Sequence, residues 1–169
     1  KDHPDWQARL SAWEADLQRQ WIDWTPMVPT ELASTSGLNH PERLHDNSIL
    51  TLGHPTTKGD IFVIGTPALE GATGLRLEAL CHDDLEFGGP GRSKYGTWAI
   101  TELEVSTQLP DSDKWEKVPL KNATADFSEP VRGLEPEWNA AFDKERRRIC
   151  GPVEFLIDGS DNTAWRADR

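Results

Sequence analysis

A run of oxygen-bearing side chains stands near the end of the sequence, in the stretch IDGSDNTAW. Asp158, Asp161 and Thr163 bring carboxylate and hydroxyl oxygens together on a few residues that follow an Asp-Gly turn. Calcium takes six to eight such oxygens from carboxylates, amides and backbone carbonyls. The stretch is not an EF-hand, because no glutamate stands at the twelfth position. The residues alone leave two interpretations open, a cation-binding loop and a plain turn rich in Asp and Asn.

A second stretch, EFGGPGRSKYG, forms a glycine-rich loop over residues 86–96. It lacks the GxxxxGK[ST] pattern and precedes a strand where a phosphate-binding loop would open a helix, so that function is excluded. Its glycines allow positive φ in a long connection between strands. Arg92, Lys94 and Tyr95 lie at the tip, where they could hydrogen-bond to a ligand or stack on it. A surface loop without a ligand is the alternative.

The sequence contains no recognisable catalytic constellation. The five histidines are scattered, and neither HExxH nor GxSxG occurs. Without a CxxC or CxxCH pattern, this segment has no zinc ribbon and no covalent haem of its own. Cys81 and Cys150 either pair in a disulfide or remain buried free thiols. We therefore expect a non-enzymatic protein.

Charge and hydropathy exclude two classes of partner. The chain of 169 residues has a net charge of −11 and a pI near 4.8. Such a charge repels nucleic acids and anionic membrane surfaces. No apolar run approaches the roughly 20 residues of a membrane span. We expect neither nucleic-acid binding nor membrane insertion.

An amphipathic helix is expected over residues 4–24, within an N-terminal helix and linker of residues 1–23. Its apolar residues follow helical spacing and favour packing against the core or another domain: Trp6, Leu10, Trp13, Leu17, Trp21 and Trp24. The chain begins inside this pattern, so we expect it to be a piece of something longer.

Short β-strands are expected after the helix, at 27–35, 48–53, 60–66, 73–80 and 96–107. They predict a mainly β fold, an antiparallel β-sandwich over residues 24–108. Residues 109–169 are expected to hold a connector, a strand after LPDSD and a partial second β segment carrying the IDGSDNTAW loop. Residues 136–149 predict a short helix or an irregular insertion, whose RRR run favours a solvated face over an anion site.

Several motifs together carry a resemblance to known proteins. IDGSDNTAW and TWAITELEV resemble segments of galactose-binding-like β-sandwiches, the discoidin or factor-type-C superfamily. In the order LRLEAL, GGPGR, TWAITE, VPLKNATADFSE and IDGSDNTAW, residues 24–128 and 151–165 are similar to the middle region of large secreted planctomycete cytochrome c type multidomain proteins. Two departures stand out: Tyr95-Gly96-Thr97-Trp98 stands where the family usually has the asparagine-containing motif nGNF, and residues 129–150 form an insertion.

The resemblance implies a jelly-roll, galactose-binding-like sandwich in a secreted, periplasmic or cell-surface protein. It implies a structural calcium ion held by Asp158, Asp161, Thr163 and Glu102 or Glu104, and a glycan ligand. Residue type adds the glycan-contacting candidates Arg92, Tyr95, Trp165 and Arg166. The expected function is thus a non-catalytic carbohydrate-binding module of a larger protein. The alternative is a structural or docking domain that binds other domains of that protein and no ligand of its own.

Overall fold

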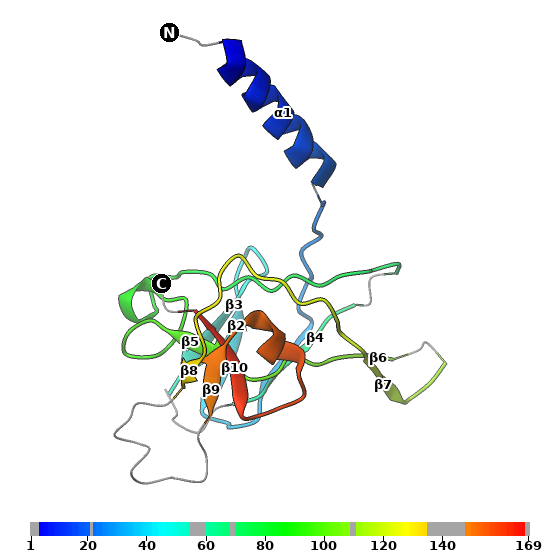
Figure 1. The fold of residues 1–169 in the computed structure, drawn as a ribbon. Helices are drawn as coiled ribbons and strands as arrows, with labels where there is room; N and C mark the ends of the chain where they lie inside the picture. The colour runs from blue at the N-terminus through cyan, green and yellow to red at the C-terminus, as the bar shows by residue number, and fades with distance from the viewer. Residues whose placement is uncertain are drawn as a thin grey trace.

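The computed structural model describes residues 4–20, 22–54, 60–67, 70–108, 111–134 and 148–167. Within these ranges the protein is mainly β, with one α-helix at the N-terminal side and ten short strands. Figure 1 shows the helix standing away from a body that the strands and their connections form. The expected mainly β fold is confirmed at this level.

Helix α1 runs from Pro4 to Gln20, four residues shorter than the predicted 4–24. Proline suits the first turn, and Asp5 and Arg19 place opposite charges at the ends that the helix dipole favours. An extended segment, residues 22–30, connects α1 to the body (Figure 1). The apolar stripe of the helix is exposed, so it does not pack against the core among the described residues, and its packing against another domain stays a prediction. No helix in the described residues is long and apolar enough to cross a membrane.

Three antiparallel strand pairs and one larger sheet make up the body (Figure 1). The pairs are β1 (Glu31–Ser34) with β4 (Phe62–Gly65), β2 (Asn39–Arg43) with β3 (Ile49–Gly53), and β6 (Val105–Gln108) with β7 (Trp115–Val118). The sheet has the order β5 (Trp98–Ile100), β10 (Thr163–Ala167), β9 (Ile149–Gly151) and β8 (Arg132–Gly133). Strands β9 and β10 run parallel, an exception to the predicted antiparallel arrangement.

Two predicted strands differ from the structure. Residues 73–80 are extended but unpaired among the described residues, so the strand predicted there is wrong. The strand predicted at 96–107 is split into β5 and β6. The break occurs because the Leu103 backbone N–H donates to the carbonyl of Leu156 at 2.7 Å, outside any sheet. The helix or insertion predicted at 136–149 lies almost wholly outside the described residues.

The core sits between the four-stranded sheet and a 3₁₀-helix, η3 (Val153–Ile157). Val153, Leu156 and Trp165 are buried in it, and partly buried Trp98 and Ile100 pack against them. Because β5 pairs with β10, segments on both sides of residue 108 share this sheet, and the boundary predicted there runs through one body.

Cys150 is buried on β9 and Cys81 is exposed, and both thiols are free.

Candidate ligand-binding site

The glycine-rich loop is closed on itself by backbone hydrogen bonds. His82 N–H donates to the Gly88 carbonyl at 2.9 Å, and Gly91 N–H donates to the Gly96 carbonyl at 2.8 Å. Gly88, Gly89 and Gly96 have positive φ as predicted, whereas Gly91, for which the same was predicted, does not. A Cβ at Gly96 would lie 2.7 Å from the Glu86 carbonyl oxygen, so the two ends of the loop lie against each other.

Two aromatic rings stand exposed at these adjoining ends. Phe87 is 83% exposed and has φ 53° and ψ 25°, a left-handed conformation that bulky residues rarely adopt. Tyr95 is 67% exposed, with the Lys94 Nζ 4.8 Å from the centre of its ring. Strained, exposed residues of this kind persist where the surroundings fix them, and they cluster at binding sites. Packing among the described residues gives no reason for the position of Phe87.

A small cavity of about 110 Å³ adjoins the start of this loop. Half-buried Arg92 lines it, and the guanidinium donates from Nη1 to the Asn39 Oδ1 at 2.6 Å. The Nη2 atom is buried and has no hydrogen-bond partner among the described residues, which leaves donor capacity for a ligand or water. The other lining residues are Thr51, Leu52, Gly53, Asp84, Leu85 and Glu86.

Asp60 fixes the side chain of Asn39, which in turn accepts the hydrogen bond from Arg92. The Asp60 carboxylate accepts hydrogen bonds from Asn39 Nδ2 at 2.5 Å, from Ser34 Oγ at 2.5 Å, and from both the N–H and the Oγ of Ser36 at 2.9 Å. Thr35 Oγ1 adds a bond of 3.1 Å. Burial opposes ionisation of this carboxyl, but the hydrogen bonds outweigh burial and hold its pKa well below the usual range. The hydrogen-bonded series Asp60–Asn39–Arg92 therefore orients the guanidinium through residues that belong to two separate strand pairs.

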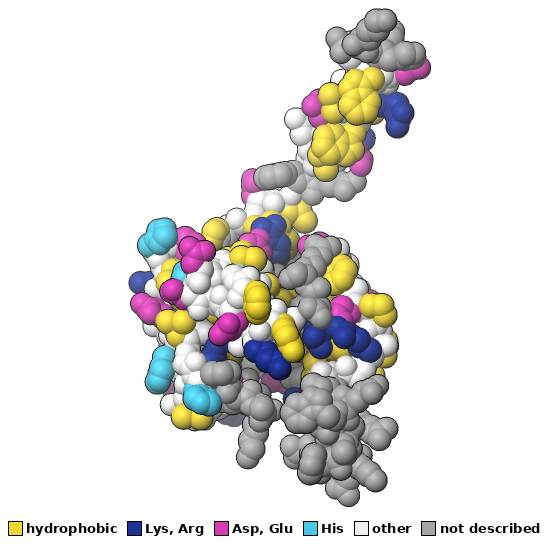
Figure 2. Space-filling view, turned by 90° about the vertical axis from the view of Figure 1, so that its left-hand side faces the viewer, with side chains coloured by type: hydrophobic (Ala, Val, Ile, Leu, Met, Phe, Trp, Pro, Cys, Tyr) yellow, Lys and Arg dark blue, Asp and Glu magenta, His cyan; other side chains and the backbone are white. Residues whose placement is uncertain are grey.

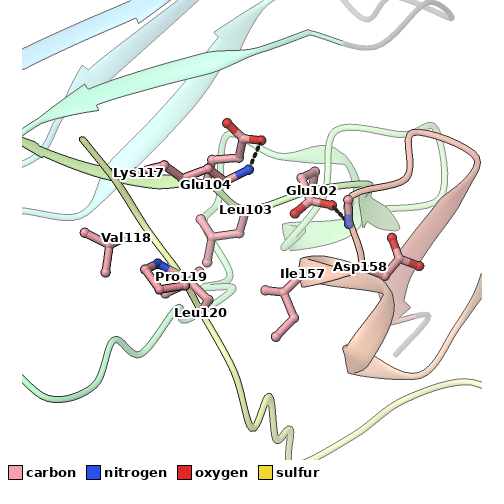
Figure 3. Close-up of a pocket in the computed structure, with 10 residues that line it drawn as sticks. Glu102, Leu103, Glu104, Lys117, Val118, Pro119, Leu120, Ile157 and Asp158 are labelled. Carbon is pink, nitrogen blue, oxygen red and sulfur yellow. Dashed lines mark hydrogen bonds and ion pairs between the residues drawn. The ribbon is translucent and has the colours of Figure 1, made fainter. Parts of the chain in front are cut away.

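A second cavity, of about 230 Å³, lies where the β6–β7 pair meets the IDGSDNTAW loop (Figure 3). Its floor is apolar, and Glu102, Glu104, Lys117 and Asp158 lie around it. Glu102 Oε2 accepts the Gly159 N–H at 2.8 Å, and Lys117 Nζ donates to Glu104 Oε1 at 2.6 Å. The predicted neighbourhood of the IDG loop and the ELEV segment is thus present. In Figure 3, however, Glu104 and Asp158 stand on opposite sides of the cavity.

The Asp158 carboxylate belongs to a hydrogen-bonded turn. It accepts the Ser160 N–H at 2.9 Å and the Thr163 hydroxyl at 2.8 Å, and Thr163 Oγ1 also lies 3.0 Å from the Ser160 carbonyl oxygen. Asp161 is exposed. Within the described ranges no three His, Cys, Asp or Glu side chains gather closely enough to hold a metal ion. These oxygens fall short of the six to eight that calcium takes, and calcium binding here stays a prediction.

The remaining two glycan-contacting candidates lie inside the body. Trp165 is 8% exposed, and its ring packs edge-on against Trp98 with 4.7 Å between ring centres. Arg166 is largely buried, with Nε 3.6 Å from the Glu129 carboxylate. These contacts give Trp165 and Arg166 packing and ion-pair roles in place of exposed ligand contacts.

Sequence reasoning found Arg92 and Tyr95 but missed Phe87, Asn39 and Asp60. An aromatic residue directly before Gly88-Gly89 in a turn-rich loop is a signal that could have drawn attention to Phe87. Asn39 and Asp60 carry no local motif.

Comparison with protein-family models, with curated proteins and with solved structures finds no match for this chain. The resemblance to galactose-binding-like sandwiches therefore rests on the motifs alone.

Proposed function

We propose that this chain is a non-catalytic carbohydrate-binding module and that the glycine-rich loop is its binding site. The observation that carries the proposal is the pair of exposed rings, Phe87 and Tyr95, on a loop whose ends lie against each other. A sugar presents an apolar C–H face that packs on aromatic rings and hydroxyls that need a few fixed polar groups. Rings exposed to this degree leave their faces available to such a ligand.

Polar groups of the adjoining cavity supply the second half of this recognition. Arg92 donates hydrogen bonds, whereas the Asp84 and Glu86 carboxylates accept them, and a sugar hydroxyl can do both. The net charge of −11 disfavours anionic glycans, so the preferred ligand is a neutral sugar. The cavity is far smaller than the 300–1,000 Å³ typical of drug-sized ligands, which favours recognition of a single sugar residue.

A glycan-array screen of the folded chain tests this proposal. We expect binding to a defined neutral glycan, weakened about tenfold by Phe87→Ala or Tyr95→Ala, since each ring acts as a binding hot spot. Trp115→Ala is the matched control, because it removes a ring that is equally exposed, at 66%, on β7. No binding from a folded sample, or equal binding by all four proteins, would contradict the proposal.

The proposal includes the features that the resemblance implies, namely a galactose-binding-like sandwich, a secreted or cell-surface location and a structural calcium ion. Running the array in calcium and again in chelator tests the last of these. Binding lost in chelator supports an ion at the Asp158 loop, and binding kept in chelator contradicts a calcium-dependent site.

The exposed stripe of α1 favours a second candidate function, docking to a protein partner. Trp6 and Trp13 are 59% and 58% exposed on a helix that stands away from the body (Figure 2). Exposed apolar residues gathered on one face mark interaction surfaces. The chain is expressed in the source cells with a photo-crosslinking amino acid at position 13. We expect a discrete protein adduct after irradiation. The absence of any adduct would contradict docking through α1.

A further inference from the structure

Helix α1 presents a continuous apolar seam with no cover from the body. Trp6, Leu10, Trp13 and Leu17 are all exposed and are spaced by four, three and four residues. This is the spacing of the a and d positions at which one helix packs into another. Figure 1 shows the helix projecting from the body, and Figure 2 shows hydrophobic side chains on its surface.

We propose that α1 pairs in antiparallel orientation with α1 of a second copy of this chain. The inference rests on the docking function and is independent of glycan binding. In antiparallel register, Leu10 faces Trp13 of the second copy, and Trp6 faces Leu17 of the second copy. Each layer of the seam then combines one large and one smaller side chain. A parallel pair would instead stack Trp on Trp and Leu on Leu, giving layers of unequal width.

Charges beside the seam complement one another in the same register. Arg9 faces Asp16 of the second copy, and the two-fold symmetry of the pair repeats this contact. Gln7 faces Glu14 of the second copy, where the amide can donate to the carboxylate. Asp16 also pairs with Arg19 of its own helix at 3.4 Å, and the Asp16 side chain is 55% exposed. No like charges meet across this interface.

The charge of the whole chain favours antiparallel over parallel pairing. Each copy carries a net charge of −11, most of it on the body that follows the helix. An antiparallel pair places the two bodies at opposite ends of helices about 25 Å long, well beyond the screening length of about 8–10 Å. A parallel pair places them side by side, where they repel. One helix per copy buries less than the 1,200–2,000 Å² of a standard interface, so the dimer is weak and concentration-dependent.

Sedimentation of the full chain over about 10–500 µM, the range suited to a small interface, tests the pairing. We expect a reversible monomer–dimer equilibrium in the wild type. Arg9→Glu and Asp16→Arg alone each weaken dimerisation about tenfold, because each places like charges opposite one another. The double variant Arg9→Glu/Asp16→Arg restores the wild-type affinity. In a parallel pair Arg9 faces Glu14 of the second copy, and Asp16→Arg rescues nothing.

Far-UV circular dichroism of each variant confirms that α1 is still formed. A wild type that stays monomeric throughout, or a double variant that stays as weak as Arg9→Glu, overturns the proposal. A monomeric chain whose position 13 crosslinks to a different protein overturns self-pairing while the docking function stands.

Discussion

Replacement of Trp165 by alanine is expected to destabilise the chain by about 3–5 kcal/mol. The ring is 8% exposed and joins Val153 and Leu156 in the core. It packs edge-on against Trp98, and its Nε1 donates to the Phe127 carbonyl at 3.2 Å. Removing it leaves a cavity and takes away this hydrogen bond. Domains are stable by only about 5–15 kcal/mol, so this substitution removes a large part of the free energy of unfolding.

Urea unfolding followed by far-UV circular dichroism measures this loss, and near-UV spectra report on the Trp98 environment. Trp115→Ala removes the same side chain from an exposed position on β7 and is expected to change stability little. Equal losses for the two variants would mean that Trp165 does not hold the core together.

The difference between these two tryptophans explains part of what sequence reasoning missed. Trp165 was a glycan-contacting candidate by residue type, and type alone does not separate a ring that stacks on a ligand from one that packs in a core. Its burial depends on β10 entering the sheet between β5 and β9. The alternation of TAWRA gives the two faces of that strand but not which face the core covers.

Local patterns located several strands: the strands predicted at 27–35 and 60–66 correspond to β1 and β4, which pair with each other. The strand predicted at 48–53 corresponds to β3, and the strand after LPDSD corresponds to β7. Residues 73–80 alternate in a similar way but find no partner among the described residues. Strand formation there depends on long-range pairing that alternation does not encode. The same holds for the stripe of α1, whose spacing predicts a helix face but not what covers it.

The hydrogen bonds that hold Arg92 at the candidate site are another case of long-range contacts that local sequence patterns do not predict. The Asp60–Asn39 contact spans 21 residues, and the Asn39–Arg92 contact spans 53. Each residue is an ordinary loop or strand-end residue in the sequence. Asp60, Asn39 and Arg92 come together only where the β1–β4 and β2–β3 pairs meet. The orientation of Arg92 therefore could not be predicted from the sequence of its own loop.

Replacement of Asp60 by asparagine is expected to cost about 2–3 kcal/mol at pH 7. The carboxylate accepts bonds from Ser34, Ser36 and Asn39, and hydrogen bonds to a charged group contribute about 1.5–3 kcal/mol each. An amide in its place turns an NH₂ group toward these donors. Arg92 then loses its fixed orientation, so glycan affinity falls as well. Asp46→Asn is the control, because exposed Asp46 also accepts bonds from a serine, Ser48, but supports no further residue.

The pH dependence of the unfolding free energy distinguishes the effect of the Asp60 charge from the effect of its side-chain shape. Its folded-state pKa lies below the unfolded value of about 3.9, so the ionised carboxylate stabilises the fold fully above about pH 5. That stabilisation is lost as the pH falls through 3.9 toward the folded-state pKa. The gap in unfolding free energy between the wild type and Asp60→Asn should therefore be constant from pH 7 to 5 and narrow at pH 3. A gap that keeps its full size at pH 3 would assign the effect to side-chain shape, and the carboxylate charge would then have no part in orienting Arg92.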